Sequence, residues 1–334
     1  MATYDPGWIR SHLGERGESD LAEETRPTAR ISDEIHLHYL HKFLTGKERV
    51  LEIGAGVGKL TGVLASLTSR LVVADISPLK LQLNQRNARA AGYADAIEAW
   101  VESDVVNLGE FRDGQFDAVV CYGGPLSYVF DQRERALREL LRVTRQDGLL
   151  FLSVRSLWGS IHKGFPSMLQ HDPRFFREVV RTGDLGPDKV AVTGSFLHAY
   201  RVEEFRALLE GTGVRIEVLT ASGVLSETWD ALLAVETMDK AVWEEVIDLE
   251  LEATRYSHVC RYAHDGGRRG SVNRKEHGPE DDIDDVQPHE VEGPESTQLP
   301  LAEPQDDPEH GAGDRLPGKV PQDQWARHIV RGDQ

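Results

Sequence analysis

The stretch VLEIGAGVGKLT, residues 50–61, decides the fold. Three glycines stand at alternate positions after an apolar run and before a helix-like run: Gly54, Gly56 and Gly58. Residues without a Cβ let another molecule approach the backbone, and the first turn of the next helix offers free N–H groups. We therefore expect a cofactor to bind at this loop, with Glu52 just ahead of it.

The spacing of the glycines separates three kinds of cofactor. A P-loop requires Ser or Thr after Gly-Lys, whereas Leu60 follows Lys59 here. The dinucleotide fingerprint G-x-G-x-x-G needs a glycine at position 59, which this chain does not have. The observed pattern is G-x-G-x-G preceded by an acid, so neither a nucleoside triphosphate nor a dinucleotide fits it.

Apolar strands and amphipathic helices alternate around this loop, which favours a parallel sheet covered on both faces. The pattern predicts a first helix over 31–45. Strands are expected within 49–54, 70–76, 95–105, 116–123 and 148–156, and helices over 59–68, 77–92 and 132–144. Residues 155–200 are irregular. A helix over 201–213, a strand over 214–223, a helix over 239–255 and a weak strand over 257–263 follow.

Five motifs occur in the order found in S-adenosylmethionine-dependent methyltransferases of the Rossmann-like class, which this chain resembles over about residues 30–263. They are VLEIGAGVG, VVADIS, ESDVVNL, FDAVVCYGGPLSYV and LRVTRQDGLLFLSV. The segment FLHAYRVEEFRALLEGTGVRIEVL resembles the approach to strand six of small-molecule methyltransferases. The resemblance implies an α/β fold with a seven-stranded, mostly parallel sheet and helices on both faces. It also implies S-adenosylmethionine as cofactor.

The resemblance assigns roles to acids at three strand ends. Glu52 is expected to face the cationic amino group of the cofactor, and Asp75 to accept from the ribose hydroxyls. Asp104, with Ser103, is expected to hold the adenine amino group. The apolar side chains of Ile76 and Val105 would flank the adenine ring. The full expected cofactor-binding set is Glu52, Gly54, Ala55, Gly56, Gly58, Asp75, Ile76, Ser103, Asp104, Val105 and Cys121.

Methyl transfer from a sulfonium requires alignment of the acceptor atom with the methyl carbon, and some acceptors also need a general base. The end of the fourth strand, CYGGPLSYV, is expected to lie beside the reacting methyl group, where Tyr122 would pack against the cofactor or contact the substrate. His162 and His198 are the base candidates, with surface or packing histidines as the alternative. No metal site is expected, because His36, His38 and His41 do not share one helix face with a carboxylate.

Three segments are expected along the 334 residues: a lid or disordered segment over 1–30, the methyltransferase domain over 31–263, and a disordered tail over 264–334. The tail holds eight of the 15 prolines and 17 acidic against eight basic residues. Such a composition has little apolar surface to offset the entropy of ordering.

The composition limits the kinds of binding partner and the cellular location that we expect. The net charge of −18 argues against a nucleic-acid partner, which needs a basic surface. Two cysteines give no disulfide framework, and neither a signal peptide nor a membrane-spanning stretch is visible, so we expect a cytoplasmic protein. The expected function is methylation of an O, N or S atom of a small molecule, for example in secondary metabolism. A methyltransferase acting on RNA or protein and a non-catalytic cofactor-binding scaffold remain alternatives, and the oligomeric state stays open.

Overall fold

The computed structural model describes residues 2–15, 27–161, 173–186, 190, 196–226, 240–254 and 262–268. Of residues 13, 15, 27, 28, 173–176 and 262–268, only the backbone is described. The chain divides into two units, 1–272 and 273–334, and every described residue belongs to the first.

Five parallel strands form the centre of the sheet: β1 (Arg49–Ile53), β2 (Arg70–Asp75), β3 (Ile97–Glu102), β4 (Phe116–Cys121) and β5 (Thr144–Arg155). Their spatial order is β3-β2-β1-β4-β5. The order reverses between β1 and β4. In open α/β sheets, ligands bind at the carboxyl ends of the strands beside such a reversal. The predicted α/β class with a parallel sheet is confirmed.

Beyond β5, the backbone of β9 (Tyr262–Arg268) pairs antiparallel with β5 on one side and with β8 (Arg215–Ala221) on the other. β9 therefore runs past residue 263, the expected end of the domain. The sequence had placed its weak strand over 257–263, which overlaps β9 only at residues 262 and 263.

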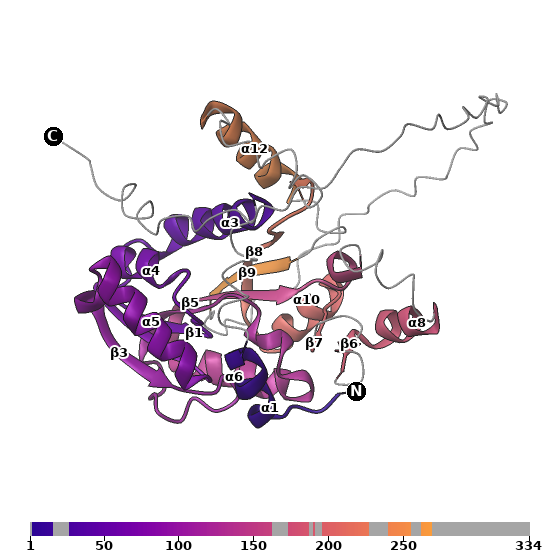
Figure 1. Ribbon diagram of the computed structural model, residues 1–334, viewed down its shortest axis with the longest axis horizontal. Helices are drawn as coiled ribbons and strands as arrows, with labels where there is room; N and C mark the ends of the chain where they lie inside the picture. Colours follow the sequence, from indigo (N-terminus) through magenta and orange to yellow (C-terminus); the bar gives the residue numbers. More distant parts are fainter. Residues whose placement is uncertain are drawn as a thin grey trace, which may run out of the picture. The chain divides into compact units, whose positions relative to one another are not determined.

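Helices connect the strands and flank the sheet. They are α1 (Pro6–Glu15), α3 (Pro27–Leu44), α4 (Thr61–Leu67), α5 (Pro78–Ala91), α6 (Arg133–Val143), α8 (Pro173–Thr182), α10 (Val202–Glu210) and α12 (Lys240–Ala253). α12 lies beside α3, where the guanidinium of Arg30 stands 4.7 Å from the centre of the Trp243 ring (Figure 1). Short elements complete the fold: the 3-10 turns η1 (Ala94–Ala96), η2 (Pro125–Ser127) and η3 (Phe130–Gln132), and the paired strands β6 (Asp184–Leu185) and β7 (Leu197–His198).

α5 shows how local sequence sets an element. Ser77 has an extended backbone and its side chain accepts a hydrogen bond from the Lys80 N–H at 3.4 Å, while Pro78 occupies the first turn. Gly92 ends the helix in the left-handed conformation. These are the start and stop signals expected from the sequence, and the predicted helix is confirmed.

Alternate residues of the central strands supply two separate cores, because successive side chains in a strand point to opposite faces. Leu51 on β1 packs with α6 and α10, whereas its neighbour Val50 packs with α3, α4 and α5. Both faces of the sheet are therefore covered, and the functional site is left at its carboxyl edge.

Candidate active site

A cavity of about 350 Å³ opens at the carboxyl ends of β1 to β5. The glycine loop between β1 and α4, the ends of β2 and β3, and the β4 end with its following loop all contribute to its wall. The N-terminal segment and α3 close the remaining sides. The cavity thus lies where the strand order reverses, the position expected for a ligand in this architecture.

Asp75 fixes the shape of the glycine loop. Its Oδ2 accepts a hydrogen bond from the Gly56 N–H at 2.8 Å, and its Oδ1 accepts one from the Ser77 N–H at 2.8 Å. Burial raises the pKa of Asp75, although these two hydrogen bonds and Lys80 oppose the shift. The carboxylate therefore joins the end of β2 to the loop that precedes α4.

The loop leaves space for a ligand above its backbone. Among the described residues, no heavy atom lies within 4 Å of the position that a Cβ at Gly56 would take. A Cβ at Gly54, by contrast, would stand 2.4 Å from Cγ of Pro125, in the loop after β4. The glycine loop is thus open toward the cavity at Gly56 and packed against the β4 loop at Gly54.

Glu52 stands at the end of β1 and is only 4 % exposed. The Thr61 hydroxyl donates a hydrogen bond to its Oε2 at 2.7 Å. Burial raises the pKa of Glu52 to about 8, with a further contribution from the charge of Asp75, while the Thr61 hydrogen bond opposes the rise. An uncharged carboxyl group is favoured here until a cation approaches it.

Asp104 follows β3 and is held from two sides. Its Oδ1 accepts from the Val106 N–H at 2.9 Å, and its Oδ2 accepts from the Tyr4 hydroxyl at 2.9 Å. Burial first, and then the charge of Asp104, raise the pKa of Tyr4, which stays a hydrogen-bond donor at neutral pH. The hydroxyl of Ser103 donates to Glu110 at 3.1 Å.

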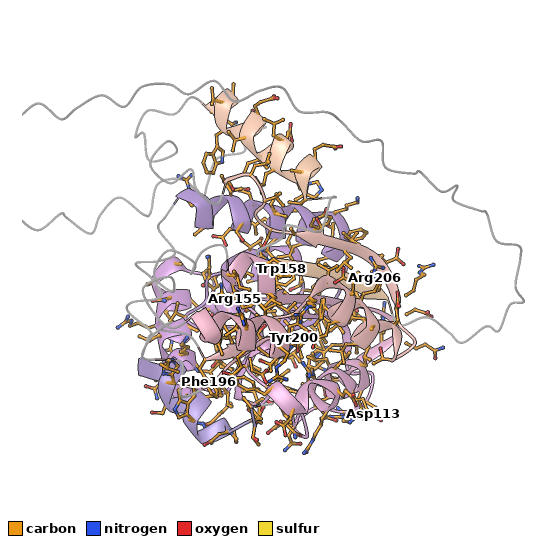
Figure 2. The ribbon with its side chains drawn as sticks, turned by 90° about the vertical axis from the view of Figure 1, so that its right-hand side faces the viewer. Asp113, Arg155, Trp158, Phe196, Tyr200 and Arg206 are labelled. Carbon is orange, nitrogen blue, oxygen red and sulfur yellow. The ribbon has the colours of Figure 1, made fainter. Side chains whose placement is uncertain are left out.

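The N-terminal segment lies against the cavity, and both Tyr4 and Ile9 contribute to the wall. Arg10 donates from Nε to the Ile76 carbonyl at 3.0 Å and pairs with Glu102 at 3.0 Å. Trp8 packs on Phe196, with ring centres 3.9 Å apart; Phe196 is labelled in Figure 2. The sequence left residues 1–30 as either a lid or a disordered segment; the described residues 2–15 contribute Tyr4 and Ile9 to the cavity wall.

The cavity is also lined by Tyr122, His36 and Arg155; Arg155 is labelled in Figure 2. The rings of His36 and Tyr122 lie 4.6 Å apart. His36 Nδ1 lies 2.8 Å from the Ser32 carbonyl, which can only accept, so Nδ1 carries a proton. Burial lowers the pKa of His36 to about 4, which leaves a neutral ring.

His36 is the residue that sequence reasoning missed. The helix around it was predicted, but His36, His38 and His41 were assigned no role beyond a metal site that was not expected. Which of them faces inward depends on the rotation of α3 against β4, which the pattern of apolar residues alone did not reveal. The Lys59–Asp33 ion pair, 2.9 Å long, lines the same side of the cavity.

Most of the expected site residues line this one cavity. They are Glu52, Gly54, Ala55, Gly56, Asp75, Ile76, Ser103, Asp104, Val105 and Tyr122. Gly58 does not belong to the lining; the site of its Cβ lies 3.1 Å from the Asn84 side chain beneath the loop. His162 lies outside the described residues.

The assignment of Cys121 to the cofactor site is corrected by the structure. Cys121 is fully buried in the core formed with α6, whereas its neighbours Val120 and Tyr122 point to the opposite face and line the cavity. The reason is the alternation of side chains along β4. Burial raises the pKa of the thiol, so Cys121 is a packing residue.

His198 is also misplaced for a general base, because it does not line the cavity. It is 1 % exposed, its Nδ1 lies 2.7 Å from Asp184, and its Nε2 lies 2.9 Å from Glu204 and 2.8 Å from Arg133. Burial alone would lower the pKa of His198, but the two carboxylates outweigh it and raise the pKa. His198 is therefore the centre of a charged cluster that joins β6, β7, α6 and α10.

The described part of the chain contains no group of three His, Cys, Asp or Glu side chains placed to hold a metal ion. None of its helices combines the length and the apolar character needed to cross a bilayer.

Comparison with known proteins identifies the class. Residues 51–152 match the family model described as "Methyltransferase domain". The chain is 33% identical over 113 residues to a glycine/sarcosine N-methyltransferase of Parasynechococcus marenigrum (strain WH8102), and 37% identical over 105 residues to a demethylmenaquinone methyltransferase of Clavibacter sepedonicus. These alignments cover 33% and 31% of this chain, and 39% and 40% of the relatives. The chain thus spans less than half the length of either relative.

A solved structure supports the fold. A chain of the complex that contains the Haloferax volcanii Trm112 methyltransferase activator aligns with a TM-score of 0.51 and 17% identity, over 80% of this chain and all of that one. Residues 51–152 therefore form a methyltransferase domain of the S-adenosylmethionine-dependent, Rossmann-like class. S-adenosylmethionine is the cofactor that this class uses.

Proposed function

We propose that this protein transfers a methyl group from S-adenosylmethionine to an O, N or S atom of a small-molecule acceptor. The observation that carries the proposal is that one cavity is lined both by the glycine loop with three strand-end acids and by a second group of residues, Tyr122, His36 and Arg155. The first group of residues suits the cofactor and the second suits an acceptor. The relatives named for glycine, sarcosine and demethylmenaquinone support a small acceptor.

The residues of the first group fit the functional groups of the cofactor. Glu52 faces the cationic amino group, Asp75 accepts from the ribose hydroxyls, and Asp104 accepts from the adenine amino group. Each carboxylate oxygen of Asp75 and Asp104 accepts one hydrogen bond from the protein. A carboxylate offers about four acceptor positions in all, so both side chains can also accept hydrogen bonds from the cofactor. Ile76 and Val105 supply apolar contacts to the ring.

S-adenosylmethionine supplies a methyl group on a positively charged sulfur, and the acceptor lone pair displaces a neutral thioether in line. The chain aligns the two reactants and keeps bulk water out, which is a large share of the rate in such reactions. Tyr4 and Ile9 cover the cofactor side, and Tyr122 lies at the β4 end beside the expected methyl position. The neutral ring of His36 presents Nε2 as a hydrogen-bond acceptor to an acceptor N–H or O–H.

The proposal extends to the surroundings of the site. We place the N-terminal residues up to about 30 as a lid. We also propose that the sheet holds the seven strands typical of the class, with β9 as the strand beside β5, and that the acidic, Pro-rich tail beyond it remains disordered. Limited proteolysis tests this: cleavage after Arg268 should leave a folded fragment that still binds cofactor. A cytoplasmic location and a role in secondary metabolism belong to the same proposal.

Calorimetric binding of S-adenosylhomocysteine to the wild type and to Asp75→Ala tests the cofactor site. Loss of this charged anchor should weaken binding by about 1.5–3 kcal/mol. Asp95→Ala is the matched control, because Asp95 is an exposed carboxylate outside the cavity. Equal affinities for the wild type and Asp75→Ala would remove Asp75 from the site.

The acceptor class is tested by incubating the wild type with labelled S-adenosylmethionine and glycine, sarcosine or a cell extract separated into small molecules, RNA and protein. Label in the small-molecule fraction is expected. Label confined to RNA or protein would replace the proposal by the macromolecular alternative. Cofactor binding without labelled product in any fraction would favour a non-catalytic scaffold.

A further inference from the structure

A chain of polar side chains crosses four elements beneath the glycine loop and ends at Glu52. The Trp100 indole Nε1 on β3 lies 3.1 Å from Asn84 Oδ1 on α5. Asn84 Nδ2 lies 2.9 Å from Thr61 Oγ1 on α4, and Thr61 Oγ1 lies 2.7 Å from Glu52 Oε2 on β1. No motif in the sequence connects these four residues.

With Glu52 ionised, the chemistry of the groups fixes the direction of every hydrogen bond in this series. An indole N–H can only donate, so the side-chain oxygen of Asn84 must face Trp100. The amide nitrogen of Asn84 then faces Thr61 and donates to its hydroxyl oxygen. The Thr61 hydroxyl has one proton, and this proton is left for Glu52. Trp100 thereby determines, through two intermediates, that Glu52 receives a donor.

Burial makes this arrangement stable. Asn84 and Thr61 are 0 % exposed, so reversing the amide would leave buried polar atoms unsatisfied, which is unfavourable. Asn84 also touches the cofactor loop: its amide nitrogen lies 3.5 Å from the Gly56 carbonyl. The chain of hydrogen bonds is therefore anchored in the core and reaches the cavity wall.

We propose that Trp100, Asn84 and Thr61 are positioning residues that aim the Glu52 carboxyl group at the amino-acid end of the cofactor and stabilise its ionised form when the cofactor ammonium group binds. The inference rests on the proposed function, because it assigns Glu52 to the cofactor amino group. A donor aimed at a carboxylate stabilises the ionised form, and the ionised form is the one that pairs with an ammonium group.

The other charged groups near Glu52 do not replace this donor. Burial raises the pKa of Glu52, with a smaller contribution from the Asp75 charge, and the Thr61 hydrogen bond opposes the rise. Glu52 in turn contributes to a raised pKa of Tyr93, after α5. Further titratable groups from the loop, α3, α5 and the β3 end line the same cavity: Lys59, Asp33, His36, Lys80 and Asp104.

The test is the pH profile of ligand binding, measured between pH 5.5 and 8 with two ligands. S-adenosylhomocysteine carries the amino-acid end, whereas 5′-methylthioadenosine lacks it and serves as the matched control. The variants are Thr61→Val, which keeps the shape and removes the hydroxyl, and Thr61→Ser, which keeps the hydroxyl. Trp100 is partly exposed, and Trp100→Phe removes the first donor of the hydrogen-bond series. This variant replaces Thr61→Val in the test if Thr61→Val folds poorly.

For Thr61→Val, we expect the rise of S-adenosylhomocysteine affinity with pH to move to higher pH, with binding at least tenfold weaker at pH 7. Affinity for 5′-methylthioadenosine should not change, Thr61→Ser should restore the wild-type profile, and Trp100→Phe should shift it in the same direction by less. An unchanged profile in Thr61→Val or Trp100→Phe, or equal weakening of both ligands, would overturn the inference. Failure of the wild type to bind S-adenosylhomocysteine would instead overturn the proposed function.

Discussion

Glu52 makes the free protein sensitive to alkali. The pKa of Glu52 is raised from 4.5 to about 8 in the folded state. The unfolded chain therefore releases this proton at lower pH than the folded chain, and the free energy of unfolding should fall as pH rises from about 4.5 to about 8.

Glu52→Gln removes this titration while keeping the shape of the uncharged side chain. Without ligand, the variant should be more stable than the wild type at pH 8, and the gain should shrink at pH 5. Urea unfolding at the two pH values measures the difference. A gain of the same size at both would show that Glu52 does not titrate in this range.

Alanine substitutions at Gly54 and Gly46 distinguish the stability cost of backbone strain from the cost of a steric clash. Both have positive φ, +75° and +82°. A Cβ at Gly54 would stand 2.4 Å from Pro125, whereas none of the described atoms comes within 4 Å at Gly46. Gly46→Ala should cost about 1 kcal/mol of stability from strain.

Gly54→Ala should cost clearly more than Gly46→Ala, because the proline ring must move as well, and it should also weaken S-adenosylhomocysteine binding. Thermal unfolding and calorimetry of the two variants provide the measurement. Equal losses in both variants would mean that the Pro125 contact is unimportant.

At the level of elements, local signals determined what the sequence could predict. The cap, proline and terminal glycine of α5 and the apolar strands β1, β2 and β4 are encoded within a few neighbouring residues. The strand-end acids followed from the fold. α1 was not predicted, because its order depends on distant partners: Ile9 is 3 % exposed through contacts with Phe130 and Phe196.

The difference between local signals and contacts between distant elements also explains which site residues were placed incorrectly from the sequence. His36 and Cys121 were on correctly predicted elements, but the face that each presents is set by packing between elements. His198 was found in an irregular region, and its partners Asp184, Glu204 and Arg133 come from separate segments. Pairwise contacts of this kind leave no spacing pattern in a single sequence.

The N-terminal segment has a prediction of its own. If residues 2–15 act as a lid, Tyr4→Phe should accelerate dissociation of S-adenosylhomocysteine several-fold, since it removes one hydrogen bond of about 1 kcal/mol. Ile9→Ala should accelerate it further by removing a buried apolar anchor. Stopped-flow measurement of the dissociation rate decides: wild-type rates in both variants would show that the segment does not retain the ligand.

For the whole molecule, the cluster around His198 joins regions far apart in the sequence and defines a pH window. The pKa of His198 is raised above 6.5, so its stabilising effect is complete below about 6.5 and is lost as pH rises through the raised value. The pKa values of Asp184 and Glu204 are lowered, so their effect is present above their ordinary values of 3.8 and 4.5 and is lost as pH falls. The cluster therefore stabilises most between about 4.5 and 6.5.

His198→Gln should lower the free energy of unfolding most at about pH 5.5 and progressively less at higher pH. His41→Gln is the control, because His41 is exposed on α3. Unfolding curves at pH 5.5, 7 and 8.5 supply the comparison. A loss that is independent of pH would indicate packing alone.

The contact between Gly54 and Pro125 has a consequence for laboratory evolution. Libraries that randomise residues 123–128 to accept new substrates should also weaken binding of the methyl donor, because Pro125 packs against the glycine loop at Gly54. Improved clones should then accumulate compensating changes around residue 54, and selection for new chemistry will proceed fastest when both loops are diversified together.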